Sequence, residues 1–122
     1  MQTDYIMKQI EMISQILGKI LFQAEPSKSE IIKDNLFARD EMLKSALRRL
    51  IDANDINGAE NLFYQELEQN PTPEMLKLGM WFYDHINMLD DETLEECDYS
   101  RQEIVDGLQM LQKIYSKEGE SV

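Results

Sequence analysis

The chain has 122 residues, of which 43% are hydrophobic and 30% charged, a composition typical of one soluble globular domain over residues 1–122. Its formal net charge of −12 repels phosphate groups, which argues against nucleic acids and anionic membranes as partners. No run approaches the roughly 20 apolar residues of a membrane span. Residues 5–22 lack the cleavage site of a signal peptide. The single cysteine, Cys97, excludes an internal disulfide and favours a reducing, cytoplasmic location.

Residues 1–24 are predicted to form an N-terminal helix, with Thr3 or Asp4 as its N-cap. Apolar residues recur every three or four positions along it, which is the pattern of one helix face. The stripe comprises Ile6, Ile10, Ile13, Leu17, Ile20 and Leu21, and Tyr5, Met12 and Ile16 widen it. So wide an apolar arc must be covered by other helices, by a second copy of the chain or by a partner. We expect burial within the chain itself.

The second helix is predicted over about residues 30–53, after a short linker at 25–29 in which Ser27 or Ser29 would be the cap. The polar run at 38–41 allows a kink or a break, so the chain is expected to have five or six helices. The buried side of the helix is expected to comprise Ile31, Ile32, Leu36, Met42, Leu43, Ala46, Leu47, Leu50 and Ile51.

Lys44, Arg48 and Arg49 form a small basic patch near the end of this second helix. Cations near a helix C-terminus offset its dipole, and these three can also pair with acidic residues elsewhere. Anion binding is the alternative, and we favour the first interpretation.

Residues 54–83 are predicted to form two helices joined by a turn at 70–73. Asp55 is expected to cap the first helix and Thr72 the second. Pro73 suits the first position of a helix, where no amide hydrogen is needed. The second of these helices is apolar nearly all round, so we expect it to be the most buried helix of the fold.

This pair of helices resembles parts of a tetratricopeptide repeat. Residues 54–71 resemble the second helix of the repeat. Ala59 falls at its small residue, Phe63 at its aromatic residue and Pro71 at its closing proline. Residues 75–82, M-L-K-L-G-M-W-F, resemble the start of the next repeat, whose usual pattern is W-x-x-L-G-x-x-Y.

The resemblance covers about one and a half units, whereas a free-standing array usually needs three or so. Glu66 stands where the repeat has a small residue, and an acidic insertion interrupts the register after Tyr83. The fold that the resemblance implies is all-α, a tetratricopeptide-like stack of helical hairpins with residues 40–88 as its repeat-like core.

Residues 89–99 form the acidic insertion, with six carboxylates within residues 90–98. We interpret it as a short helical turn flanked by exposed loop. Residues 54–122 hold 16 acidic and 4 basic side chains, so the whole net charge lies in this half of the chain.

The closing helix is predicted over residues 100–117. Ser100 and Glu103 have the spacing of a capping box, in which each side chain accepts from the other's backbone amide. Gly107 is interpreted as a close contact with another helix. Residues 117–122 are expected to be a frayed tail.

A second resemblance concerns both ends of the chain. Residues 4–11, D-Y-I-M-K-Q-I-E, and 19–22, K-I-L-F, resemble the opening of a small uncharacterised family of bacterial helical proteins. Residues 100–108, S-R-Q-E-I-V-D-G-L, also resemble that family. The resemblance implies an all-helical, tetratricopeptide-like protein of low-GC Gram-positive bacteria and no particular chemistry.

No catalytic signature is evident, so we expect no enzyme activity, no cofactor and no metal. The acids of residues 90–98 are the best candidate ligands for a hard cation, but adjacent carboxylates rarely converge, and a solvated loop is the favoured interpretation. Residues 53–64 fail as a calcium loop, because Ala53 and Tyr64 occupy its first and last ligand positions. His85 and Cys97 together supply too few ligands for zinc.

We therefore predict a cytoplasmic protein–protein interaction module. Its partner would be a protein or peptide with a basic surface, and a homodimer is a further possibility. The alternative is a small carboxylate-based enzyme or divalent-cation-binding protein that uses Asp84, Asp90 and Asp91. The candidate partner-binding residues are Tyr64, Trp81, Tyr83, Asp90, Asp91 and Glu92.

Overall fold

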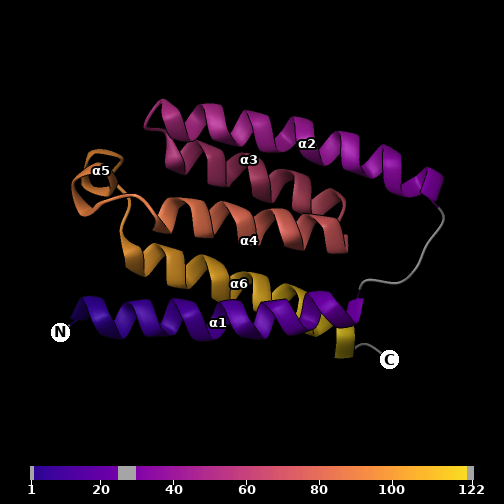
Figure 1. Ribbon diagram of the computed structural model, residues 1–122, viewed down its shortest axis with the longest axis horizontal. Helices are drawn as coiled ribbons and strands as arrows, with labels where there is room; N and C mark the ends of the chain where they lie inside the picture. The colour runs from indigo at the N-terminus through magenta and orange to yellow at the C-terminus, as the bar shows by residue number, and fades with distance from the viewer. Residues whose placement is uncertain (1, 25–29, 121–122) are drawn as a thin grey trace.

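A computed structural model describes the backbone of residues 2–24 and 30–120, and the side chains of residues 4–23 and 40–116. The described residues form six helices and no strand, so the all-α prediction is confirmed (Figure 1). The helices are α1 (Gln2–Ala24), α2 (Glu30–Asp52), α3 (Ile56–Gln69), α4 (Pro73–Asn87), α5 (Asp91–Glu96) and α6 (Arg101–Glu120). None of these six helices is long and apolar enough to cross a membrane. The predicted linker at 25–29 and its caps Ser27 and Ser29 lie outside the described residues.

The long helices lie side by side in the order α2, α3, α4, α6 and α1 (Figure 1). Helix α4 is central, because it packs against α1, α2, α3 and α6. Its side chains Leu76, Phe82 and Ile86 are fully buried. The prediction that this helix lies deepest in the fold agrees with its position.

Helix α1 packs on α6 and α4, so the expected burial within the chain is confirmed. Ile10, Ile13 and Leu17 lie in the core. The predicted widening of this face was wrong at two positions, since Tyr5 is 66% and Met12 57% exposed. Only the part of this helix face that α4 and α6 can cover is buried.

The ends of the predicted hairpin are confirmed in detail. The Asp55 carboxylate accepts from the amide of Gly58 at 2.9 Å, and the Thr72 hydroxyl accepts from that of Met75 at 3.1 Å. Pro73 is the first residue of α4. These caps satisfy amides that a helix leaves without an internal partner.

The predicted capping box before α6 is also confirmed. The Glu103 carboxylate accepts from the Ser100 amide at 2.7 Å, and the Ser100 hydroxyl accepts from the Glu103 amide at 3.2 Å. The acidic insertion does contain a short helix, α5. It is more than a solvated loop, however, because Leu94, Cys97 and Tyr99 are buried.

Helix α2 is continuous from Glu30 to Asp52, so the predicted second helix is confirmed and the alternative of a break at 38–41 is not realised. Three other expectations were wrong. Met42 is 76% exposed because it points away from the core. Helix α6 continues to Glu120 rather than fraying at 117. Thr3 and Asp4 cannot cap α1, because the helix has already begun at Gln2. The predicted buried positions Ile31, Ile32 and Leu36 fall among the side chains that the structure does not describe.

Candidate functional site

Three tyrosine hydroxyls from three parts of the chain converge around one carboxylate. Tyr83 of α4 donates to Glu60 Oε2 of α3 at 2.5 Å, and Tyr99, just before α6, donates to the same oxygen at 3.0 Å. The hydroxyl of Tyr64, one turn after Glu60, lies 3.0 Å from that of Tyr83. These bonds tie α3, α4 and the start of α6 together.

The three hydroxyls hold their protons more firmly than tyrosine in water does. Removal from water is the main cause, and the negative charge of Glu60 adds to it. Together they raise the pKa of Tyr64 to about 12 and raise the pKa of both Tyr83 and Tyr99 further. The hydroxyls therefore remain donors at neutral pH, as a carboxylate acceptor requires.

Gly107 allows α6 to approach this cluster closely. The Tyr83 hydroxyl lies where a β-carbon of residue 107 would be, and the Gly107 carbonyl oxygen accepts from the Tyr64 hydroxyl at 3.2 Å. The predicted close helix contact at this glycine is confirmed.

An open groove of about 800 Å³ runs between α3 and α6, beside the tyrosine cluster. We call it the acidic groove. One wall comprises Glu60, Tyr64, Leu67, Glu68 and the following Pro71, and the other comprises Glu103, Asp106, Gly107, Met110 and Ile114. Each wall thus carries two carboxylates, and none of the ten lining residues is a lysine or an arginine.

Glu60 has a double role in this arrangement. Both tyrosine bonds reach Oε2, and within the described part of the chain no hydrogen bond is made to Oε1. The carboxylate is half-buried and lines the acidic groove. Its orientation is fixed from behind by Tyr83 and Tyr99, so it presents a preorganised negative charge.

The six predicted partner-binding residues do not form one site. Tyr64 lines the acidic groove, but Tyr83 is only 1% exposed and lies behind Tyr64. Asp90 caps α5 by accepting from the Thr93 amide at 2.8 Å, and this bond lowers the pKa of its carboxyl. Asp91 pairs with Arg101 at 3.1 Å.

Trp81 lies in a third place, between α4 and α2. Its ring stacks on that of His85, with 5.2 Å between ring centroids. The ammonium of Lys44 lies 4.9 Å and the guanidinium carbon of Arg48 6.0 Å from its ring centroid. The basic patch of α2 is thus partly occupied in cation–π contacts with Trp81.

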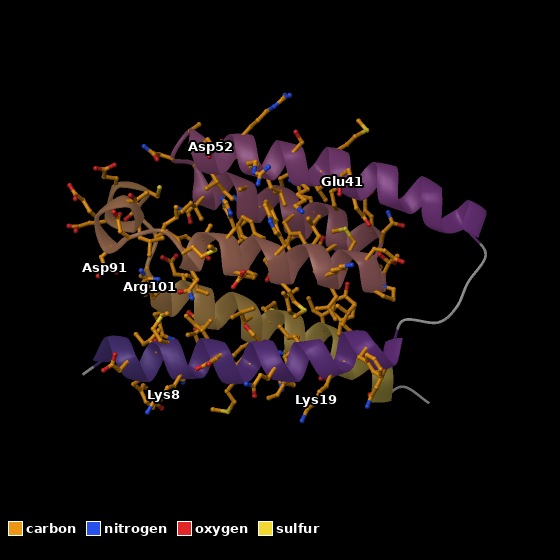
Figure 2. All side chains as sticks on the ribbon, in the orientation of Figure 1. Lys8, Lys19, Glu41, Asp52, Asp91 and Arg101 are labelled. Atoms are coloured by element: carbon orange, nitrogen blue, oxygen red, sulfur yellow. The ribbon has the colours of Figure 1, made fainter. Side chains whose placement is uncertain are left out.

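Arg101 joins the ends of α4, α5 and α6 (Figure 2). It donates to the carbonyl oxygens of Asn87 and Leu89 at 2.9 and 2.8 Å, and to the Asn87 side chain at 2.8 Å. The Asn87 carbonyl belongs to the last residue of α4, where a helix leaves its carbonyls without helical partners, and Leu89 follows just after the helix. Arg101 thereby holds the acidic insertion through the backbone carbonyl of Leu89 as well as through its ion pair with Asp91.

Among the side chains that the structure describes, no three of His, Cys, Asp and Glu are grouped as a metal ion would require. Burial raises the pKa of the Cys97 thiol, and its sulfur lies 3.7 Å from Asn54 Oδ1. Thiolate chemistry therefore has no support here.

Sequence reasoning missed Glu60, Tyr99, Glu68 and Asp106. The available signal was spacing, since Glu60, Tyr64 and Glu68 recur every four residues and therefore share a face of α3. Nothing in the sequence showed that this face of α3 lies opposite the corresponding face of α6.

Residues 1–116 match the family of unknown function DUF6483, and the chain belongs to this family. The prediction of an uncharacterised, all-helical family is confirmed, and its bacterial, low-GC Gram-positive origin stays a prediction. No curated protein and no solved structure matches the chain.

Proposed function

We propose that this chain is a cytosolic protein–protein interaction module and that the acidic groove is its binding surface. The supporting observation is the groove itself, which combines apolar side chains with four carboxylates. Met110 is 48% exposed there, and methionine adapts its shape to different partners. Such a surface favours a partner segment that carries both apolar and basic residues.

We also propose that the fold is tetratricopeptide-like. In its support, α2 packs against both α3 and α4, and α4 packs against α6. These are the neighbours expected when two helical hairpins stack. The departures are the short helix α5, inserted between α4 and α6, and α1, which covers the far side of α6 (Figure 1).

Self-association is the second candidate, and a specific observation favours it. Tyr5, Met12 and Phe22 are exposed on α1, Phe22 by 84%. Lys8 and Lys19 point away from the bundle on the same helix (Figure 2). A homodimer would cover these apolar side chains.

The alternative of a carboxylate enzyme or cation-binding protein has less support. Asp90 acts as a helix cap and Asp91 as an ion-pair partner. Asp84 is exposed.

The proposal is tested by pull-down from lysate of the native host with three baits. They are the wild type, the groove variant Glu68→Gln/Asp106→Asn and the control variant Glu11→Gln/Asp52→Asn. Both variants remove two exposed carboxylates, so their net charges are equal, but only the first pair lines the groove.

We expect a discrete protein that the wild type and the control retain and that the groove variant loses. High salt should also release it, because screening weakens contacts between exposed charges. Equal capture by all three baits would place binding elsewhere. Capture of nothing, together with a dimeric mass by light scattering, would favour self-association through α1.

A further inference from the structure

We infer that the segment received by the acidic groove is a basic amphipathic helix of about three turns, an inference that rests on the function proposed above. The first reason is the shape of the groove. Its walls are two helices, α3 and α6, that run in the same direction (Figure 1). The lining of α6 extends from Glu103 to Ile114, which is about 16 Å at the rise of an α-helix, or three turns.

The second reason concerns the backbone of the bound segment, which we call the guest. An extended segment on an apolar surface must find partners for its amides and carbonyls. The walls supply few, because the backbone groups of α3 and α6 are already paired within their helices, and the Gly107 carbonyl also accepts from Tyr64. A helical guest satisfies its own backbone and presents only side chains.

The third reason is the placement of charge. The groove is lined by apolar side chains, among them Leu67, Met110 and Ile114, and by two carboxylates on each of its two walls. A helix with one apolar stripe flanked on both sides by lysine or arginine would match this pattern. Its apolar stripe would contact the middle of the groove, and its cations would face both walls.

Glu60 is the expected anchor for one of these cations. Its Oε2 is held by Tyr83 and Tyr99, the residue lines the groove, and Oε1 makes no hydrogen bond within the described part of the chain. A carboxylate whose position is already fixed loses little conformational freedom on binding, so its contact with a lysine or arginine is favoured over contacts with the exposed Glu68 and Asp106.

The test uses two synthetic, fluorescently labelled peptides of identical composition, rich in leucine, lysine and alanine. In one, leucine recurs at helical spacing with lysine on both flanks, and in the other the same residues are scrambled. Binding is measured by anisotropy to the purified wild type, to Glu68→Gln/Asp106→Asn and to Glu11→Gln/Asp52→Asn, and peptide helicity is measured by circular dichroism.

We expect the patterned peptide to bind the wild type and the control at least roughly tenfold more tightly than the scrambled one, and to gain helicity. The groove variant should lose roughly tenfold in affinity. Glu60→Gln, whose fold is checked by circular dichroism, should lose more than Glu68→Gln.

Equal binding of both peptides would overturn the inference that the bound segment is helical. The groove would then be a general surface for basic segments. If the groove variant binds the patterned peptide as tightly as the wild type does, the peptide does not bind in the acidic groove. If neither peptide binds, the helical guest is rejected. The proposed function is tested separately by the pull-down from lysate, in which the groove variant is compared with the wild type and the control.

Discussion

The hydroxyl of Tyr83, in α4, occupies the space next to Gly107, in α6, where every other amino acid would carry its β-carbon. This contact lets the Tyr83 hydroxyl reach both Glu60 and Tyr64. The absence of one side chain in α6 thus permits the polar cluster that orients the carboxylate of the acidic groove.

Gly107→Ala should destabilise the protein. The added methyl group would meet the Tyr83 ring and hydroxyl, and overpacking of this kind costs about 1–3 kcal/mol. Urea denaturation followed by circular dichroism measures the change in the free energy of unfolding.

Gly18→Ala is the matched control for that substitution. A β-carbon at Gly18 would meet nothing within 4 Å, and replacing glycine by alanine inside a helix stabilises by about 0.5–1 kcal/mol. The two variants should therefore shift stability in opposite directions, and a shift of equal sign would contradict the contact described for Gly107.

Replacing the Glu60 carboxylate by an apolar group should lower the stability of the protein more than neutralising its charge. In Glu60→Leu the hydroxyls of Tyr83 and Tyr99 lose their carboxylate acceptor and keep only the contact with the Tyr64 hydroxyl and the long one, 3.5 Å, with the Glu103 carbonyl. A buried donor left without a good acceptor costs about 1–3 kcal/mol. Glu60→Gln keeps an amide oxygen of the same size as an acceptor.

Thermal denaturation of the two variants should rank Glu60→Leu well below Glu60→Gln. If the two variants are equally stable, the tyrosine hydroxyls do not depend on this acceptor.

Stability should fall as the pH rises above about 10, the usual pKa of tyrosine. The unfolded chain then loses tyrosine protons that the folded chain keeps, because the pKa of Tyr64 is raised to about 12 and those of Tyr83 and Tyr99 are raised further. The unfolded state binds fewer protons in this range, so the free energy of unfolding decreases with pH. Each such tyrosine contributes a slope of up to about 1.4 kcal/mol per pH unit.

Denaturant titrations at pH values from neutral to alkaline measure this slope. Tyr83→Phe removes one of the three groups and should make the slope shallower, although the variant is less stable at neutral pH. A slope unchanged in Tyr83→Phe would show that other groups cause the alkaline loss.

Arg101→Lys should destabilise the end of the bundle where α4, α5 and α6 meet. A single ammonium group cannot replace the fork that reaches Asn87, Leu89 and Asp91. Because the Arg101 side chain is only 16% exposed, we expect a loss of about 1–3 kcal/mol from acceptors left unpaired.

Asp91→Asn is the control for Arg101. The Asp91 side chain is 83% exposed, and exposed ion pairs contribute about 0–1 kcal/mol. Chemical denaturation of both variants should show a clear difference between them. Equal losses would mean that the ion pair, rather than the backbone carbonyls, holds α6 to α4.

The helix ends were predictable from sequence because each depends on a few neighbouring residues. Asp55, Thr72 and the Ser100–Glu103 pair act within one turn of their own position. Exposure was less predictable, because apolar residues such as Met42 and Tyr5 occur on protein surfaces as well as in cores.

The candidate site could be predicted only in part. The sequence predicts Tyr64 and Tyr83 as partner-binding residues because they are aromatic. Their hydrogen bonds to each other, and that of Tyr83 to Glu60, join residues that are about twenty positions apart in the sequence. The groove arises from the spacing of α3 and α6 over α4. That spacing is a property of tertiary packing, which no local pattern encodes.

The packing of α1 against α6 has a consequence for synthesis of the chain. Helix α1 leaves the ribosome first among the six helices, and the helix that covers most of its apolar face, α6, leaves last. Until then Ile10, Ile13 and Leu17 lack their full set of native neighbours, and such unburied segments are prone to aggregate or to recruit chaperones. A chain truncated before α6 should therefore keep its central helices yet behave in the cell as a client for quality control.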